Sequence, residues 1–452
     1  MDMDDARDSS PARDLPSGGM NTEPAGGPAA APLAADRGRG PGRRRTTLAV
    51  VVSIVVIGGA AGTAIAILAG HSAANGPGTI AGAQASTPAT TAVASARASA
   101  SPIPWQVVSL SSGGSPLSAV ACVSSTDCWG AGGTTIEQYT ASAWQVVSNP
   151  APSGGVLNDV ACASSDDCWA VGGVYVPGNG SSQALLIERY SGTSWAIVNG
   201  PALSSDTGEG AVVLNGVTCM SVDDCWAVGE NGDQMLIAQY SGDAWDPVIA
   251  PSSGGGALDA VACASVTECW AVGPGTVILQ YSGSGWAVVT SPPVPGTHPG
   301  HNFPSLVAVT CPGPEECWAV GNIGAGDFPV EGGFVTEQPV VEVYTGGSWS
   351  VVTSPHISAP NGAVLGGVAC ISADDCWAVG TTQGDVWDLV GTPPPDMSLP
   401  LVERYSAGSW SVVDSPQVSD GLLDAIAGMP GSQLWAVGAA GYPGVALIET
   451  TP

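Results

Sequence analysis

The chain has 452 residues, a formal net charge of −29 at neutral pH, and no lysine. From residue 103 onward, 32 aspartates and glutamates accompany only two arginines, Arg189 and Arg404. Proteins that bind nucleic acid need a basic surface to contact phosphates, so this charge balance excludes nucleic acid as a partner and permits cationic partners or a divalent metal.

The N-terminal region contains one candidate membrane span. Residues 48–69 are uncharged and mostly apolar, so we expect a transmembrane helix over residues 47–70. Five arginines lie between residues 37 and 45, and the next one is Arg97. The positive-inside rule then places residues 1–46 in the cytoplasm, as a disordered tail, and the rest of the chain outside the cell. A cleaved signal peptide is the alternative, but its apolar core is normally shorter, which favours an uncleaved signal-anchor.

Residues 71–102 are rich in Ala, Ser, Thr and Gly and show no strand pattern, so they are predicted to form a flexible stalk. All twelve cysteines follow this segment, on the side predicted to be extracellular. Disulfides persist in that environment. The predicted localisation is therefore the cell membrane, as a single-pass protein with its large C-terminal domain outside.

A short block recurs seven times from residue 118 to the end, and six copies resemble V-x-C-x5-C-W-A-V-G. Two cysteines at this spacing can meet across a hairpin, whereas zinc sites usually pair two short Cys/His knuckles, so we predict six disulfides. The predicted pairs are Cys122–Cys128, Cys162–Cys168, Cys219–Cys225, Cys263–Cys269, Cys311–Cys317 and Cys370–Cys376. The seventh copy keeps the Trp, as Trp435, and has Gly428 and Leu434 at the cysteine positions.

Each of the six copies with cysteines is followed by an apolar run ending in Tyr and, five residues later, by a Trp that begins another apolar run. One unit therefore holds four strand-like runs: a, ending at the first Cys; b, the C-W-A-V-G run; c, ending at Tyr; and d, beginning at Trp. Four strands per unit of roughly 40–60 residues are typical of a propeller blade. We predict an all-β fold over residues 103–452, a seven-bladed β-propeller of four-stranded antiparallel blades.

The last unit ends after its strand c, while a spare d-type run containing Trp105 precedes the first strand a. A ring that closes through this run has no free sheet edge between its first and last units. We therefore predict that strand 103–109 completes blade seven.

Length variation is confined to the b–c and d–a connections, which lie on one face of a propeller. The stretch from the Trp of strand b to the Tyr of strand c varies from 10 to 28 residues, whereas the first Cys and that Trp are always seven apart. Variable loops on a rigid scaffold are where binding sites usually lie, and neutral drift of insertions is the alternative. The candidate binding residues on this face are Tyr175, Phe328, Glu331, Phe334, Asp385, Trp387 and Asp388.

Acidic residues also gather in the a–b hairpins, for example Asp166–Asp167 and Asp223–Asp224. Calcium binding is one interpretation, but Asp is favoured in turns for its own backbone bonding and no calcium-loop motif occurs. The histidines His298 and His301 lie in a long d–a loop and are interpreted as solvated. We predict no cofactor, with calcium as the alternative.

The blade resembles kelch and galactose-oxidase-like repeats, in which paired glycines end strand b; Gly132–Gly133 and Gly172–Gly173 match that pair. Its Y-S-G-x-S-W turn also resembles the BNR or Asp-box repeat of sialidase-like propellers, without the full S-x-D-x-G-x-T-W. The whole is most similar to exported bacterial propellers with a Cys-Trp blade motif. The enzymatic signatures of these families do not transfer. A sialidase-like site needs three arginines, and a galactose-oxidase-like copper site needs a Cys–Tyr crosslink where each Cys here has a repeat partner.

These patterns favour a binding or sensory ectodomain, anchored by residues 47–70, that recognises a cell-wall glycan, peptide or protein on the variable face. A carbohydrate hydrolase or lyase is the alternative and would use two carboxylates on that face. The acids considered for that role are Asp206, Glu209, Glu230, Asp233, Asp327 and Glu331. A structural spacer is the third interpretation. No catalytic residue is predicted, and the sequence favours a protein that is not an enzyme.

Overall fold

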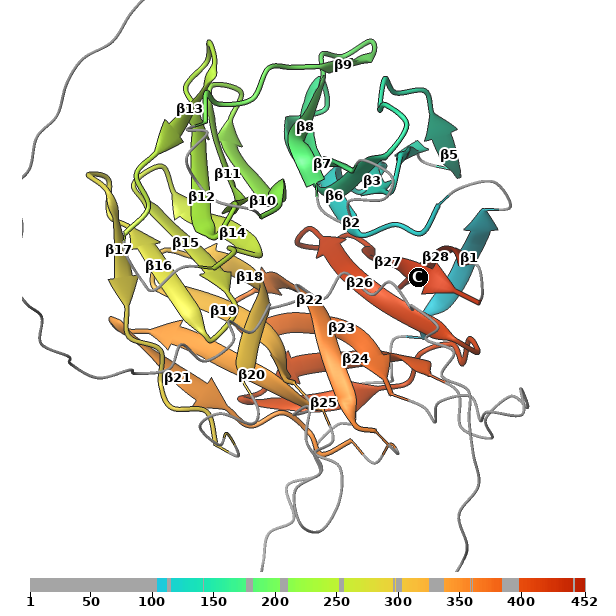
Figure 1. Cartoon of the computed structure of the whole chain (residues 1–452). Coiled ribbons are helices and arrows are strands. Elements are labelled where there is room, and N and C mark those ends of the chain that lie inside the picture. The colour runs from blue at the N-terminus through green and yellow to red at the C-terminus, as the bar shows by residue number, and fades with distance from the viewer. Residues whose placement is uncertain are drawn as a thin grey trace, which may run out of the picture. The chain divides into compact units, whose positions relative to one another are not determined.

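The computed structural model describes residues 104–111, 115–140, 142–175, 182–203, 210–251, 256–295, 297, 303–324, 337–357, 359, 361–383, 398–441 and 444–451. The described residues form seven antiparallel four-stranded sheets, which are the blades of a propeller (Figure 1). The predicted all-β, seven-bladed fold is thereby confirmed. Among the described residues no helix is long and apolar enough to span a membrane, and the predicted span at 47–70 lies outside them.

In the first four blades the strands follow one another in chain order from the innermost to the outermost. Blade one contains β2 (Ala119–Ser124), β3 (Asp127–Gly132), β4 (Thr135–Thr140) and β5 (Trp144–Val147). Blade two contains β6 (Gly155–Ser164), β7 (Asp167–Tyr175), β8 (Ser182–Tyr190) and β9 (Trp195–Ile197). Blade three contains β10 (Val212–Ser221), β11 (Asp224–Asn231), β12 (Gln234–Tyr240) and β13 (Trp245–Val248). Blade four contains β14 (Ala260–Ser265), β15 (Glu268–Gly273), β16 (Val277–Tyr281) and β17 (Trp286–Val289).

The remaining blades keep the same order, except that the last one takes its outermost strand from the other end of the chain. Blade five contains β18 (Pro304–Gly313), β19 (Glu316–Ile323), β20 (Gln338–Thr345) and β21 (Ser348–Val352). Blade six contains β22 (Ala363–Ser372), β23 (Asp375–Thr382), β24 (Leu399–Ser406) and β25 (Ser409–Val413). Blade seven contains β26 (Gly421–Gly428), β27 (Leu434–Ala440), β28 (Val445–Thr450) and β1 (Gln106–Ser111).

The ring closes in two ways. The innermost strands β2, β6, β10, β14, β18, β22 and β26 contact one another in a complete cycle, with β26 against β2. The N-terminal strand β1 pairs antiparallel with β28, the last strand of the chain (Figure 1). It begins at Gln106 and ends at Ser111, later at both ends than the range 103–109 expected from the sequence, and its register shifts between Val107 and Ser109.

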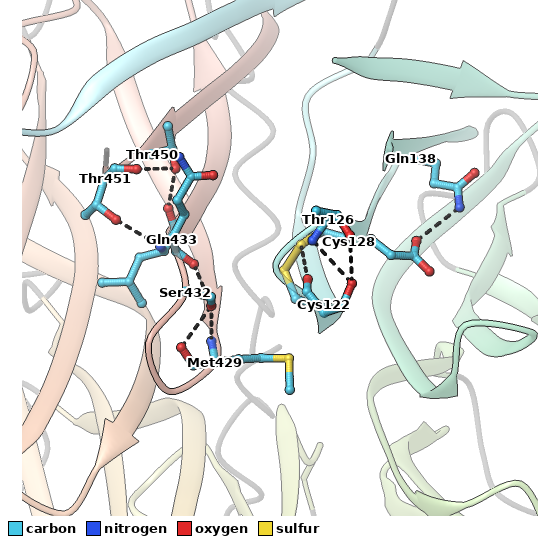
Figure 2. The surroundings of a disulfide bond; sticks show 12 residues. Cys122, Thr126, Cys128, Gln138, Met429, Ser432, Gln433, Thr450 and Thr451 are labelled. Carbon is cyan, nitrogen blue, oxygen red and sulfur yellow. Dashed lines mark hydrogen bonds between the residues drawn. A yellow bond between two sulfur atoms is a disulfide. The ribbon is translucent and has the colours of Figure 1, made fainter. Parts of the chain in front are cut away.

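The cysteine pairs close the a–b hairpins. Cys122 lies directly opposite Cys128 in the ladder of β2 and β3, with their Cα atoms 4.0 Å apart. All six predicted pairs form disulfides, which confirms that prediction. The serine that follows the first cysteine by two residues shapes the turn, since Ser124 Oγ accepts the Thr126 amide at 3.2 Å (Figure 2). In blade seven a turn closed by Met429 and Ser432 takes the place of the disulfide-bonded turn (Figure 2).

The blades pack through one repeated aromatic contact. In six of the seven blades the Trp of strand b lies against both the Tyr of strand c and the Trp of strand d in the next blade; in blade six, Trp377 lies against Trp105. Trp129, for example, has its ring centroid 4.7 Å from that of Tyr190 and 5.3 Å from that of Trp195. All seven strand-b tryptophans are almost fully buried. Edge-to-face aromatic packing of this kind therefore forms the core between blades.

Candidate functional site

Three acidic residues and one tyrosine lie at the b–c/d–a ends of blades two, three and four. Tyr175 ends β7, Glu230 lies near the end of β11, Asp233 occupies the following turn, and Asp259 immediately precedes β14. These positions belong to b–c connections or to the entry of strand a, so all four lie on the face whose loops vary. We refer to Tyr175, Glu230, Asp233 and Asp259 as the acidic cluster.

Glu230 is the electrostatic centre of the acidic cluster. Burial raises its pKa, and the negative charge of Asp233 raises it further. Burial raises the pKa of Asp259 to about 7, with a further contribution from the charge of Glu230, and the pKa of Tyr175 rises for the same two reasons. Mutual effects of this kind mean that side chains from three blades share one electrostatic environment.

The two arginines among the described residues do not pair with the acidic cluster, because both are engaged elsewhere. Arg189 Nη2 lies 2.6 Å from Asp167 Oδ2, and Arg404 Nη2 lies 2.7 Å from Asp375 Oδ2. These pairs join strand c to the start of strand b. Both arginines are therefore paired within their own blades.

Asp259 follows the leucine at the start of strand a, at the position that Asn158 and Asn215 occupy in blades two and three. The equivalent residues Asn158 and Asn215 each donate a side-chain hydrogen bond to a leucine carbonyl of the next blade, at 2.9 Å in both cases. Asp424 has the same position in blade seven, and burial raises its pKa to about 7. The neighbouring acid Asp159 differs, since it accepts the amides of Val160 and Val217 at 2.8 Å and ties blade two to blade three.

A second feature of the same face is an apolar groove of about 440 Å³ on blade five. Its walls come from the connection that enters β18, the start of β20 and the residues that follow β21. Pro339, Val351 and Val352 are half-buried and provide its apolar surface, and His356 is exposed in the loop at its edge. The groove offers a place for an apolar side chain of a ligand.

Only some of the predicted site residues lie in the described part of the chain. Tyr175 is half-buried and belongs to the acidic cluster, as do Glu230 and Asp233 from the set of acids considered for catalysis. Of the other candidates, those outside the described residues are Phe328, Glu331, Phe334, Asp385, Trp387, Asp388, Asp206, Glu209, Asp327, His298 and His301. Their part in a site therefore stays a prediction.

The acids of the a–b hairpins have internal roles on the opposite face. Asp127 accepts the side-chain amide of Gln138 at 3.1 Å, and Asp224 accepts that of Gln239 at 3.2 Å. Together with the two arginine pairs, these bonds link strand b to strand c in four blades. Within the described part of the chain, no group of three or more His, Cys, Asp or Glu side chains is arranged to hold a metal ion.

Sequence reasoning missed a set of buried glutamates on strand c. Glu137, Glu188, Glu342, Glu403 and Glu449 are each fully buried. Ser291 Oγ donates to Glu342 at 3.1 Å and Ser354 Oγ to Glu403 at 3.0 Å, in each case from the preceding blade. The signal was present as the recurring [IV]-E-x-[YT] pattern. Burial raises the pKa of Glu188, Glu342, Glu403 and Glu449 to about 7, so a raised pKa alone does not mark a ligand site in this protein.

No family model and no curated protein sequence matches this chain. Several solved structures share its fold. Virginiamycin B lyase from Staphylococcus aureus is 15% identical with a TM-score of 0.52, over 77% of this chain and 99% of that one. The WD40 repeats of RRP9 are 11% identical with a TM-score of 0.52, and U3-55K is 9% identical with a TM-score of 0.51; each match covers 77% of this chain and 98% of the other.

These similarities establish a propeller and nothing finer. They do not distinguish a kelch-like from a BNR-like blade, and one of these proteins is a lyase while another is a WD40-repeat domain. A shared fold does not decide function, which has to be argued from the site.

Proposed function

We propose that this protein is a binding module whose propeller recognises a peptide or protein partner on the b–c/d–a face. Residues 47–70 would hold it in the membrane with the propeller outside the cell, as the sequence predicts. The observation that carries the proposal is the contrast between the two faces. Four hairpin acids on the a–b face are engaged in bonds within their own blades, whereas the acidic cluster draws on three blades and pairs with neither of the described arginines.

A peptide or protein fits this face better than a neutral glycan does. Glycan sites usually present a shallow aromatic surface, and Tyr175 is the aromatic residue that the structure places in the acidic cluster. The apolar groove on blade five adds a second contact area of different chemistry on the same face. A ligand that uses both needs charged and apolar groups along one chain, which a polypeptide provides.

Full-length protein in lipid nanodiscs would be used to select binders from a random dodecapeptide library, with a panel of cell-wall polysaccharides in parallel. We expect selected peptides to lose at least tenfold in affinity with Glu230→Lys. The matched control Asp374→Lys, an exposed hairpin acid on the opposite face, should change affinity less than twofold. Binding only to polysaccharide, or loss with Asp374→Lys alone, would overturn the proposal.

A carbohydrate hydrolase is the second candidate, favoured by one observation. Asp259, with a pKa of about 7, lies in the same electrostatic environment as Glu230, and a proton-donating and an ionised carboxyl are what glycoside hydrolysis requires. Glu188 and Glu449 have a similarly raised pKa although they are fully buried and cannot contact a substrate, which weakens this argument. Release of sugars from purified cell wall by the intact protein, lost with Asp259→Asn, would establish it.

A further inference from the structure

Glu449 lies on β28, the strand at which the two ends of the chain meet. This strand is between β27 and β1, and Glu449 pairs with Ala436 on one side and with Val107 on the other (Figure 1). Its side chain is fully buried, and neither carboxyl oxygen has a hydrogen-bond partner among the described residues. Burial without a donor disfavours the ionised form, because the carboxylate loses its hydration and gains no bond in return.

The polar side chains next to Glu449 do have partners. Thr450 Oγ1 donates to the Leu434 carbonyl at 2.7 Å, and Thr451 Oγ1 accepts the Leu434 amide at 3.0 Å (Figure 2). In this stretch of three polar residues, Glu449 is therefore the one that receives no bond from the described part of the chain.

The carboxyl group of Glu449 is directed toward blade six. Leu447, two residues earlier, belongs to the core cluster that contains Trp377 and Val379 of blade six. Ile448 belongs instead to the cluster shared with blade one. Because side chains alternate between the two faces of a strand, Glu449 shares the face of Leu447 and lies at the interface between blades six and seven.

Blades five and six have a donor for the glutamate at this position. Ser291 Oγ donates to Glu342 at 3.1 Å, and Ser354 Oγ donates to Glu403 at 3.0 Å, in each case from the preceding blade. Each serine stands five residues after the Trp that begins strand d of its own blade.

At the interface before blade seven this pattern is only half kept. Ser415 stands five residues after Trp410, but its hydroxyl group donates to the Pro400 carbonyl of its own blade at 3.3 Å. The serine is thus present, and its bond is made within blade six instead of to Glu449.

The charged groups that blade six brings to this interface are Asp375 on β23 and Arg404 on β24, and these two pair with each other at 2.7 Å. Neither β27 nor β1 contains a titratable side chain. Burial is the cause that raises the pKa of Glu449 to about 7. The other described acids of blades six and seven are Asp374, Glu403, Asp414, Asp420 and Asp424.

The same interface holds the strand that closes the ring. β1 is attached to blade six through one described aromatic contact, in which the ring centroid of Trp105 lies 5.8 Å from that of Trp377. Its register against β28 shifts between Val107 and Ser109, next to the pair that Val107 makes with Glu449. Glu449 therefore lies where the ring is closed by a strand with an irregular ladder.

We propose that Glu449 makes the closure of the ring sensitive to pH, so that ionisation of its carboxyl group favours release of β1 from β28. While β1 is paired, the neutral carboxyl group fits its dry surroundings. When β1 leaves, the edge of β28 is open to water, and water solvates the carboxylate. The inference concerns the closure of the ring and does not depend on what the b–c/d–a face binds.

The pH window follows from the two states of Glu449. Its pKa is about 7 in the closed ring and returns toward the ordinary value of 4.5 when water reaches it. The stability that the protonated form provides is fully present below pH 4.5 and is lost as pH rises through 7. Opening of β1 should therefore become at least about tenfold more frequent between pH 5 and pH 7.5 and level off above that.

Amide hydrogen exchange of the full-length protein in nanodiscs tests this, with each rate divided by the intrinsic exchange rate at the same pH. We expect the protection of β1 to fall at least tenfold from pH 5 to pH 7.5. The matched strand is β17 of blade four, where Val288 pairs with Leu279 as Val107 pairs with Glu449. Because no glutamate occupies that position, the protection of β17 should change less than threefold.

Two variants locate the effect. Glu449→Gln keeps the shape of the side chain but cannot ionise, so β1 should keep its pH 5 protection at pH 7.5. The control Glu188→Gln removes the other glutamate with two unpartnered oxygens, in blade two, and should leave the fall in β1 protection unchanged.

The proposal is overturned if wild-type β1 is equally protected at both pH values, a comparison that needs neither variant to fold. It is also overturned if the fall persists in Glu449→Gln. Loss of the fall with Glu188→Gln would overturn it as well, since pH would then act on the whole propeller and not on its closure.

Discussion

Five strands c carry a glutamate two residues before the position of their Tyr, or of Thr451 in blade seven, and all five side chains are fully buried. Two of them accept a serine hydroxyl from the preceding blade, Glu342 from Ser291 and Glu403 from Ser354. Both oxygens of Glu188 and Glu449 lack a hydrogen-bond partner among the described residues. An ionised carboxylate in such a place is costly, so burial raises the pKa of Glu188, Glu342, Glu403 and Glu449 to about 7 and favours their neutral form below that pH.

This burial predicts a propeller that is more stable in acid than in mild base. The pKa of Glu188 rises from 4.5 to about 7 on folding, so the folded state binds the extra proton. The stability from that protonation is fully present below pH 4.5 and is lost as pH rises through 7. Glu188→Gln should raise the free energy of unfolding by about 1–3 kcal/mol at pH 8 and leave it nearly unchanged at pH 5.

Denaturant unfolding at pH 5 and pH 8 would measure this effect. The control is Glu315→Gln, which removes an exposed acid from a hairpin tip and should have little effect at either pH. A wild-type protein that is equally stable at both pH values, or a Glu188→Gln variant that is less stable at pH 8, would contradict the account.

Tyr175, Glu230 and Asp233 were predictable as site residues because they stand in the connections whose lengths vary. Asp259 was not, because its significance depends on where the innermost strand meets the next blade. Nothing local distinguishes L-D-A-V, which contains Asp259, from L-N-D-V, whose Asp159 accepts two backbone amides and has a structural role. The burial of the strand-c glutamates was not predictable for a related reason. An acidic residue in a strand normally indicates a solvent-exposed face, and the sequence does not show that a neighbouring blade covers it.

The motif C-W-A-V-G is explained at the level of the hairpin. Strand a bulges opposite the end of the motif; in blade two the register shifts between Leu157 and Asp159. This bulge brings the Val156 carbonyl against Gly172, so that a Cβ atom at Gly172 would collide with its oxygen. The equivalent glycines Gly229, Gly321, Gly380 and Gly438 each meet the carbonyl of their own strand a in the same way.

Replacing Gly172 by Ala should therefore destabilise the protein. The added methyl group has backbone rather than a flexible side chain in its way, so β6 must shift, and we expect a loss of about 2–3 kcal/mol. Gly313→Ala is the control, since a Cβ atom there meets no heavy atom within 4 Å. Urea denaturation with both variants measures the difference in stability. Equal midpoints would show that β6 can shift to make room for the methyl group without a loss of stability.

The number and order of the strands were predictable because the same residues mark the strand ends in almost every unit: the Cys pair, the Tyr and the Trp. The bulges were not, because they insert one residue without changing the spacing between those markers. Their effect appears only in the ladder, where Leu214 pairs with Gly229 but Gly216 pairs with Val228. Asp259 corresponds to the residue that bulges in blades two and three, Asn158 and Asn215, but in blade four it immediately precedes β14.

The ring has one seam that differs from the rest. At six interfaces between blades a Trp meets both a Tyr and a Trp, whereas between blades six and seven Trp377 meets only Trp105, with centroids 5.8 Å apart. Thr451 stands at the Tyr position and instead accepts the Leu434 amide. Blade seven also lacks the hairpin disulfide, and its strand β1 joins from the N-terminus with an irregular register. Less aromatic area is therefore buried where the two ends of the chain meet.

We expect the ring to open at this seam first, with β1 leaving β28 before any other pair of strands separates. Amide hydrogen exchange followed strand by strand should show at least tenfold lower protection for β1 and its partners on β28 than for β5 and β4 of blade one. Trp105→Ala removes the one aromatic contact that the described residues give this strand, and it should abolish the strand's protection while blades one to five keep theirs. The matched variant Trp144→Ala, in a blade held by a disulfide and by Tyr139, should leave β5 partly protected. If Trp105→Ala instead lowers protection equally in all seven blades, the propeller unfolds as a single unit, and the strand that joins the two ends of the chain is as firmly held as the others.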